Sequence, residues 1–159
     1  MPKGQGQKQK KRMKKLRKDK ARKKSIQGNS PTSSRNLIKK AATFPVKDCW
    51  INTGWDQQDS TGLTRIIITR QQPDGLLVFG SFMVDMLLLG VKDAHAEAHV
   101  PSSKIKEMLT YVYPDTVPEP CDLTLAHQII YQSIDYAAEY EMKPHKDFKL
   151  AKHLLETRG

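Results

Sequence analysis

Residues 62–90 read GLTRIIITRQQPDGLLVFGSFMVDMLLLG, and this stretch decides the fold. Gly62–Arg70 is an apolar, β-branched run bounded by glycine and arginine, which is the pattern of a strand. Gln72–Gly75 has proline and aspartate at its central positions and glycine last, the residue order of a type I turn. The stretch therefore predicts an antiparallel β-hairpin.

The return segment of the hairpin, Leu76–Gly90, alternates between two faces that are both apolar. A strand that is apolar on both sides lies between two layers of structure. The segment is 15 residues long, which exceeds a usual strand. We therefore expect it to bend, with Gly80 and Gly90 as the places where the backbone turns.

Downstream of the hairpin the hydrophobic period becomes that of a helix. Residues 105–112 carry apolar side chains at helical spacing, and Thr124–Glu141 does the same over a longer span. Asp147 stands where it can cap a third helix. Three prolines predict a loop at Tyr113–Cys121. The predicted fold class is α+β, a bent antiparallel hairpin or small sheet packed against about three helices.

The charge of the chain is divided between two parts. Residues 1–47 hold 17 Lys and Arg against the single acid Asp19, a formal charge of +16, whereas residues 48–159 hold 10 against 16 acids, a charge of −6. We expect 1–47 to be a basic, largely disordered arm and linker, because no hydrophobic face offsets the entropy of ordering it. Residues 48–159 are then a mildly acidic globular domain. The longest apolar run, Met86–Leu89, is far shorter than the roughly 20 residues of a membrane span.

The arm points to a nucleic-acid partner, because each neutralised phosphate releases condensed counterions. No aromatic side chain precedes Phe44, so base stacking is not available and contact should be independent of sequence. Binding to anionic lipid normally needs a second anchor, and Pro2 stands where N-myristoylation requires glycine. The residues expected to contact phosphates are Lys8, Lys10, Lys11, Arg12, Lys14, Lys15, Arg17, Lys18, Lys20, Arg22, Lys23 and Lys24.

The lysine-rich composition of residues 1–47, punctuated by glycine and glutamine, resembles the tails of ribosomal proteins. This resemblance implies ribosomal RNA as the partner, with ribosomal proteins as further contacts. The favoured interpretation is a cytoplasmic, ribosome-associated RNA-binding protein that needs no cofactor and no membrane. A mitochondrial presequence is also basic, but such leaders are Arg-rich and amphipathic, whereas the arm is mostly lysine.

A second interpretation is a metal-dependent hydrolase or nuclease with Asp85, Asp93, His127 and His145 as its site residues, the arm serving to tether the substrate. Asp85 interrupts an apolar strand, so its carboxylate needs a partner or a cleft, and Lys92 and Asp93 are candidate partners. Convergence of the four residues would favour the enzyme, and scattering would favour the binding protein. A third interpretation is a protein-interaction module that the arm localises.

Other histidines and the cysteines carry weaker signals. His95 and His99 are four apart and would share one face of a helix, but Glu97 has the wrong offset for an HExxH zinc motif. Cys49 and Cys121 are 72 positions apart and have no CxxC context, so they do not form a zinc-ligand pattern. Two reduced thiols are the default interpretation, and a disulfide stays open.

Two segments resemble an uncharacterised domain family of prokaryotes: RQQPDGLLVFGSFMVDMLLLGVKDA at 70–94 and AHQIIYQSIDYAAEYEMKPHKDFKLAKHLL at 126–155. Members of that family show a similar RQPDG turn, a VD…LGVK strand end and an AH…IIY…PH.DF stretch. The resemblance covers Gly62–Leu155 and implies a shared fold, without a reaction or a ligand. The basic arm lies outside it.

Overall fold

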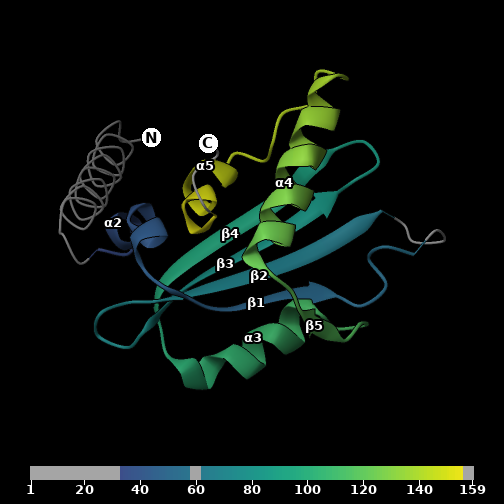
Figure 1. The fold of residues 1–159 in the computed structure, drawn as a ribbon. Helices are drawn as coiled ribbons and strands as arrows, with labels where there is room; N and C mark the ends of the chain where they lie inside the picture. The colour runs from purple at the N-terminus through teal and green to yellow at the C-terminus, as the bar shows by residue number, and fades with distance from the viewer. Residues whose placement is uncertain (1–32, 58–61, 156–159) are drawn as a thin grey trace, which may run out of the picture.

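The computed structural model describes residues 33–57 and 62–155, which form one antiparallel sheet with helices on both faces (Figure 1). The α+β class predicted from the sequence is confirmed. The disorder expected for the start of the arm, at residues 1–32, falls outside the described residues.

The five strands lie in the order β4-β3-β2-β1-β5, and each neighbouring pair is antiparallel. Helices of the α type alternate with short 3₁₀ helices, labelled η. The elements are α2 (Ser34–Lys39), η1 (Ala41–Thr43), β1 (Val46–Asn52), β2 (Leu63–Gln71), β3 (Leu77–Asp85), β4 (Gly90–Val100), η2 (Ser102–Lys104), α3 (Ile105–Val112), β5 (Pro118–Pro120), α4 (Leu123–Ala138), α5 (Phe148–Ala151) and η3 (Lys152–Leu154).

The predicted hairpin is present as β2 and β3. Their register runs without a break from the pair Leu63 and Asp85 to the pair Gln71 and Leu77. The turn closes with a hydrogen bond from the Gly75 N–H to the Gln72 carbonyl at 3.0 Å, and Gly75 has a φ of +88°. A positive φ is easily adopted by glycine, so this turn depends on it.

The return strand is shorter than predicted, because β3 ends at Asp85 and residues 86–89 form an exposed turn. Leu87 and Leu88 are 62% and 40% exposed. Gly90, with a φ of +70°, then begins β4. Gly80 lies within β3 and does not divide it into two strands. A Cβ there would come within 2.9 Å of Leu154 Cδ2. Its small size therefore lets η3 approach the sheet.

The segment after that turn, for which the sequence predicted no element, forms strand β4. Ala94, Ala96 and Ala98 pack towards the core, while the histidines and acids between them point to the other face. His95 and His99 are therefore two strand residues, not neighbours on a helix. The predicted loop at 113–121 likewise contains a short strand, β5, which adds to the edge of the sheet at β1.

Two hydrophobic cores lie on opposite faces of the sheet. The larger core joins the sheet to α2, α4, α5 and η3, and the smaller one joins it to α3. In the larger core α4 buries Ala126, Ile129 and Ile130, as its apolar stripe predicts. None of the described helices has the length and apolarity to cross a membrane.

The packed part of the chain begins before Asp48, where the sequence placed the domain boundary. Ile38 of α2 and Ala41 of η1 are 2% and 0% exposed and belong to the larger core. Ser33 starts α2, because its side-chain oxygen accepts a hydrogen bond from the Asn36 N–H at 3.3 Å. The basic segment that precedes the sheet is thus partly built into the fold.

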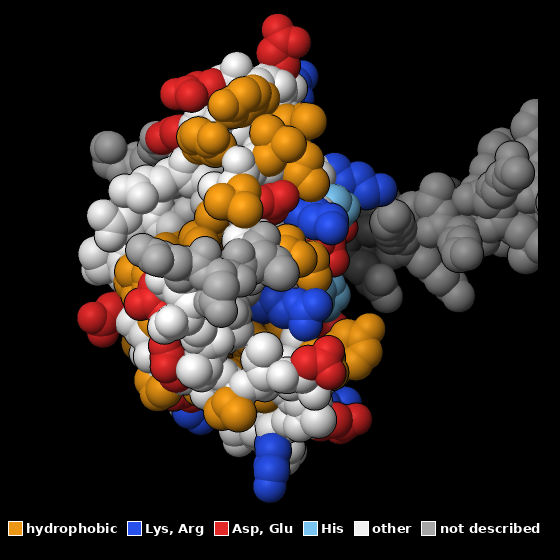
Figure 2. Space-filling model, turned by 90° about the vertical axis from the view of Figure 1, so that its right-hand side faces the viewer, with side chains coloured by type: hydrophobic (Ala, Val, Ile, Leu, Met, Phe, Trp, Pro, Cys, Tyr) orange, Lys and Arg blue, Asp and Glu red, His pale blue; other side chains and the backbone are white. Residues whose placement is uncertain are grey.

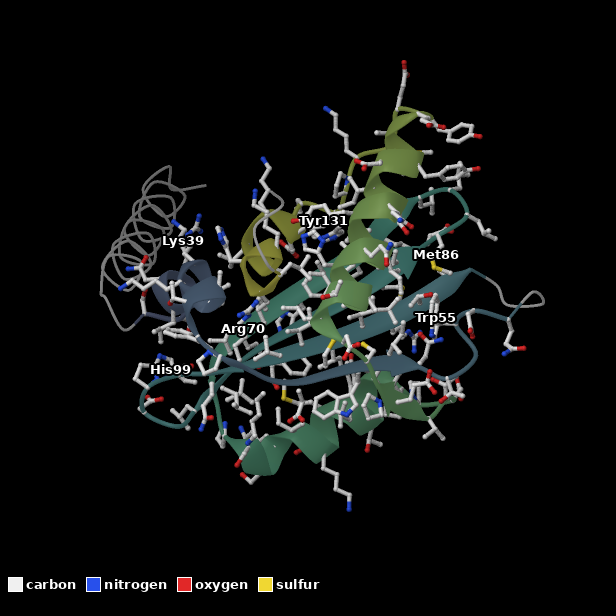
Figure 3. The ribbon with its side chains drawn as sticks, in the orientation of Figure 1. Lys39, Trp55, Arg70, Met86, His99 and Tyr131 are labelled. Atoms are coloured by element: carbon white, nitrogen blue, oxygen red, sulfur yellow. The ribbon has the colours of Figure 1, made fainter. Side chains whose placement is uncertain are left out.

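A buried arginine of β2 connects both ends of the described chain. Arg70 is 4% exposed, and its Nε donates to the Leu154 carbonyl at 2.8 Å while its Nη1 donates to the Phe44 carbonyl at 2.8 Å. The same Nη1 reaches the Ala42 carbonyl at 3.5 Å. Figure 3 shows Arg70 in the sheet beneath the α2 and α5 side of the molecule. One guanidinium therefore holds η1 and η3 against the same strand.

We predict that Arg70→Met lowers the free energy of unfolding by about 3 kcal/mol, because it leaves at least two buried carbonyls without donors. Urea denaturation monitored by circular dichroism measures this loss. Arg65→Met is the matched control: Arg65 lies on the other face of β2, is half-buried, and donates to the Val112 carbonyl alone at 2.8 Å. Equal losses for the two variants would contradict the role given to Arg70.

Candidate functional site

The described part of the basic segment forms a cationic surface on α2. Ile38 faces the core, which leaves Arg35, Lys39 and Lys40 exposed on the outer side of the helix. Figure 3 shows Lys39 on α2. The twelve residues predicted to contact phosphates, Lys8 to Lys24, lie outside the described residues. The structure therefore describes the cationic surface of α2, which follows these residues in the chain.

A second basic element lies beside α2. Phe148 and Ala151 of α5 and Leu154 of η3 are buried, which leaves Lys149 and Lys152 exposed. Figure 1 shows α5 next to α2, and α2 packs on both α5 and η3. We call Arg35, Lys39, Lys40, Lys149 and Lys152 the α2–α5 basic surface.

Lysines from both halves of this surface act on one group, the imidazole of His153. Burial lowers the pKa of the His153 imidazole, and the charges of Lys152 and then Lys39 lower it further. Lys152 follows α5, whereas Lys39 belongs to α2. No aspartate or glutamate occurs in residues 34–47 or 148–155, so these lysines are not neutralised by acids of their own segments. The surface is suited to an anionic partner.

The four residues of the alternative metal site do not come together. Asp93 and His145 are neighbours, with 3.9 Å between Oδ1 and Nε2. Asp85 is the last residue of β3, and its Oδ1 accepts hydrogen bonds from the Leu87 and Leu88 N–H groups of the following turn at 2.9 and 3.2 Å. These amides, not Lys92 or Asp93, are the partners that the structure gives it.

His127 lies on α4, on the face of the sheet that the larger core occupies. Its ring contacts that of Tyr131 with 4.5 Å between centroids and 46° between the ring planes, so the i+4 spacing on the helix produces an aromatic contact. His95 instead pairs with Glu97 at 2.7 Å. In residues 33–57 and 62–155, no three His, Cys, Asp or Glu side chains are arranged to hold a metal ion.

A groove of about 630 Å³ runs between α3 and the uncovered part of β3 and β4. Four carboxylates line it, together with one lysine and one histidine; they are Asp93, Glu97, Glu107, Asp147, Lys104 and His95. In Figure 2, the histidines that are visible lie next to both basic and acidic side chains. His145 stands between two of these carboxylates, at 3.7 Å from Asp147. Such a lining disfavours a polyanion, so the groove and the α2–α5 basic surface suit different ligands.

Comparison of the chain with protein-family models, with curated proteins and with solved structures gave no match.

Sequence reasoning missed the contribution of α5 and η3 to the basic surface. A signal was present, because Lys143, Lys146, Lys149 and Lys152 recur at every third position. Lys143 and Lys146 precede the helix, so only the last two continue the charge of α2. Their closeness to Lys39 required knowledge that both ends of the described chain pack on β4.

The position of Asp85 predicts a modest structural role. Asp85→Ala removes the oxygen that accepts from two turn amides, and we expect it to lower the free energy of unfolding by about 1 kcal/mol. Asp85→Asn keeps an oxygen at Oδ1 and should unfold close to the parent protein. Urea titration of the three proteins checks this, and an Asp85→Ala protein as stable as its parent would remove the structural role.

Proposed function

We propose that this protein is a ribosome-associated RNA-binding protein, whose cationic N-terminal segment contacts phosphates and whose α2–α5 basic surface extends that contact onto the folded domain. The observation that carries the proposal is that the fold places more cations where the basic arm enters it. Residues 1–24 hold 13 Lys and Arg, residues 25–34 are an uncharged linker, and α2, which follows, packs on the elements that hold Lys149 and Lys152.

The physical basis is counterion release, which gives affinity without a shaped pocket. Residues 1–47 carry +16, while the domain that follows is mildly acidic, so the binding energy comes from one part of the chain. The acidic lining of the α3 groove supports the same division, because it repels phosphate from that face. Of the alternative hydrolase site, Asp93 and His145 are neighbours, but no three metal-ligating side chains gather in the described residues, so an enzyme built on the four has little support there.

RNA is preferred over DNA because the arm resembles in composition the extensions of ribosomal proteins. An extended chain of 24 residues spans up to roughly 80 Å, enough to run between the helices of a large folded RNA. The folded domain then stays at the RNA surface, where the basic residues of α2 and α5 face the backbone. Ribosomal RNA is the substrate class that this arrangement fits best.

The first expected outcome concerns salt. If about six cations contact phosphates, affinity for a duplex falls about a thousandfold between 50 and 200 mM salt. Fluorescence anisotropy with a folded ribosomal RNA fragment, a single strand and duplex DNA measures this dependence. A shallow slope would contradict the phosphate contacts, and equal affinity for DNA and RNA would remove the ribosomal assignment.

A charge-reversal pair tests the contribution of the folded domain. The double variant Lys39→Glu with Lys152→Glu removes two proposed phosphate contacts. The slope of log affinity against log salt concentration should therefore become shallower by about 1.4–1.8. Lys104→Glu with Lys106→Glu changes the net charge equally but lies at η2 and α3, on the other face of the sheet. We expect the control to keep most of the slope. If both pairs weaken binding alike, only net charge matters and the surface has no specific role.

Removal of residues 1–32 tests the segment itself. The truncation keeps Ser33 and the buried Ile38, so the described fold should retain its thermal transition. RNA affinity should fall steeply, because 13 of the 17 cations before residue 48 are lost. A truncated protein that binds RNA as tightly as the full chain would refute the role of the arm.

A further inference from the structure

The two cysteines, separated by 72 positions in the chain, are neighbours in the fold. Cys49 of β1 and Cys121, which follows β5, have their sulfur atoms 3.2 Å apart. The Cys121 N–H also donates to the Cys49 carbonyl at 3.0 Å, which continues the pairing of Trp50 with Pro120. The two residues are therefore directly opposite one another in an antiparallel ladder, with both thiols free.

This position is compatible with a disulfide. Opposite residues that share a backbone hydrogen bond in an antiparallel pair have Cα atoms roughly 5.5 Å apart. Disulfide-bonded cysteines have Cα atoms roughly 4.4–6.8 Å apart, so no movement of β1 or β5 is required. From their present separation the sulfurs need to approach by about 1 Å, which side-chain rotation supplies.

The two thiols differ in access and in acidity. Cys49 is buried, with 7% of its surface exposed, whereas Cys121 is half-buried at the edge of the sheet. The hydrogen bond from Cys49 lowers the pKa of the Cys121 thiol, although burial and the carboxylates of Asp122 and Glu119 oppose this. The same bond, together with burial, raises the pKa of the Cys49 thiol. Because the thiolate is the nucleophile in disulfide exchange, Cys121 is the group that reacts first.

We propose that Cys49 and Cys121 form a reversible redox site that exchanges with low-molecular-weight disulfides such as glutathione disulfide. The Cys121 thiolate attacks one sulfur of glutathione disulfide, forms a mixed disulfide and releases one glutathione thiolate. The Cys49 thiol, losing its proton, then attacks the Cys121 sulfur and expels the second glutathione. The protein dithiol loses two electrons, and one glutathione disulfide becomes two glutathiones.

The bond has a defined structural effect. It ties the short strand β5 and the start of α4 at Leu123 to β1, at a point where β5 is held by only three paired residues. This inference is independent of RNA binding, because the cysteines belong to β1 and to the residue after β5, and neither is part of the α2–α5 basic surface.

The full chain, reduced and then incubated with glutathione disulfide, should lose the mass of two hydrogens and both reactive thiols. Cys49→Ala should instead accumulate one glutathione on Cys121, because the second step lacks its nucleophile. Cys121→Ala should react at least about tenfold more slowly, since its remaining thiol is buried. Intact-protein mass spectrometry over time measures all three.

Two results would overturn the proposal. One is a parent protein that keeps two free thiols or stops at the mixed disulfide. The other is a Cys121→Ala protein that reacts as fast as Cys49→Ala. A melting curve provides a second readout, because the oxidised parent should melt roughly 5–15 °C above its reduced form. The melting temperature of the double variant Cys49→Ala with Cys121→Ala should not change on oxidation. An equal shift in this variant would show that the effect does not come from the two cysteines.

Discussion

The arrangement of this protein depends on a buried guanidinium. Arg70 of β2 donates hydrogen bonds to the carbonyls of Phe44 and Leu154, which lie 110 positions apart in the chain. Neither η1 nor η3 has the length to be stable alone, because short helices need tertiary contacts. The hydrogen bonds of Arg70 and the burial of Ile38 supply those contacts. The neighbourhood of α2 and α5, and with it the basic surface, depends on these hydrogen bonds together with the packing of both segments on β4.

Positive and negative side chains gather at different places on the described fold. The α2–α5 basic surface adds to the charge of the N-terminal segment, whereas helix α4 has no lysine or arginine and four carboxylates line the groove beside α3. In the proposed function, a polyanion meets the α2–α5 basic surface and not the acidic groove. Orientation arises from charge distribution, which needs no base-specific contact.

The sequence was informative where local patterns and packing agree. The β2–β3 hairpin and α4 were predictable because the Gln72–Gly75 turn and the apolar stripe are local signals. Residues 86–89 were misjudged because an apolar run does not reveal that it is exposed. Strand β4 was missed because its core side chains are alanines, which favour helices by propensity and carry a weak strand signal. The contact of Cys49 with Cys121 and that of Asp93 with His145 depend on long-range pairing, which no local pattern encodes.

Strand β5 is built from the tripeptide Pro118-Glu119-Pro120, and two of its three residues have no amide hydrogen. An exposed edge strand is normally a template on which another chain can pair and start aggregation. Proline withholds the donors that such pairing needs. At the opposite margin, the His145 N–H already occupies the Val91 carbonyl of β4 at 2.9 Å. Both borders are thus partly blocked, so two copies of this protein brought close together resist joining their sheets edge to edge.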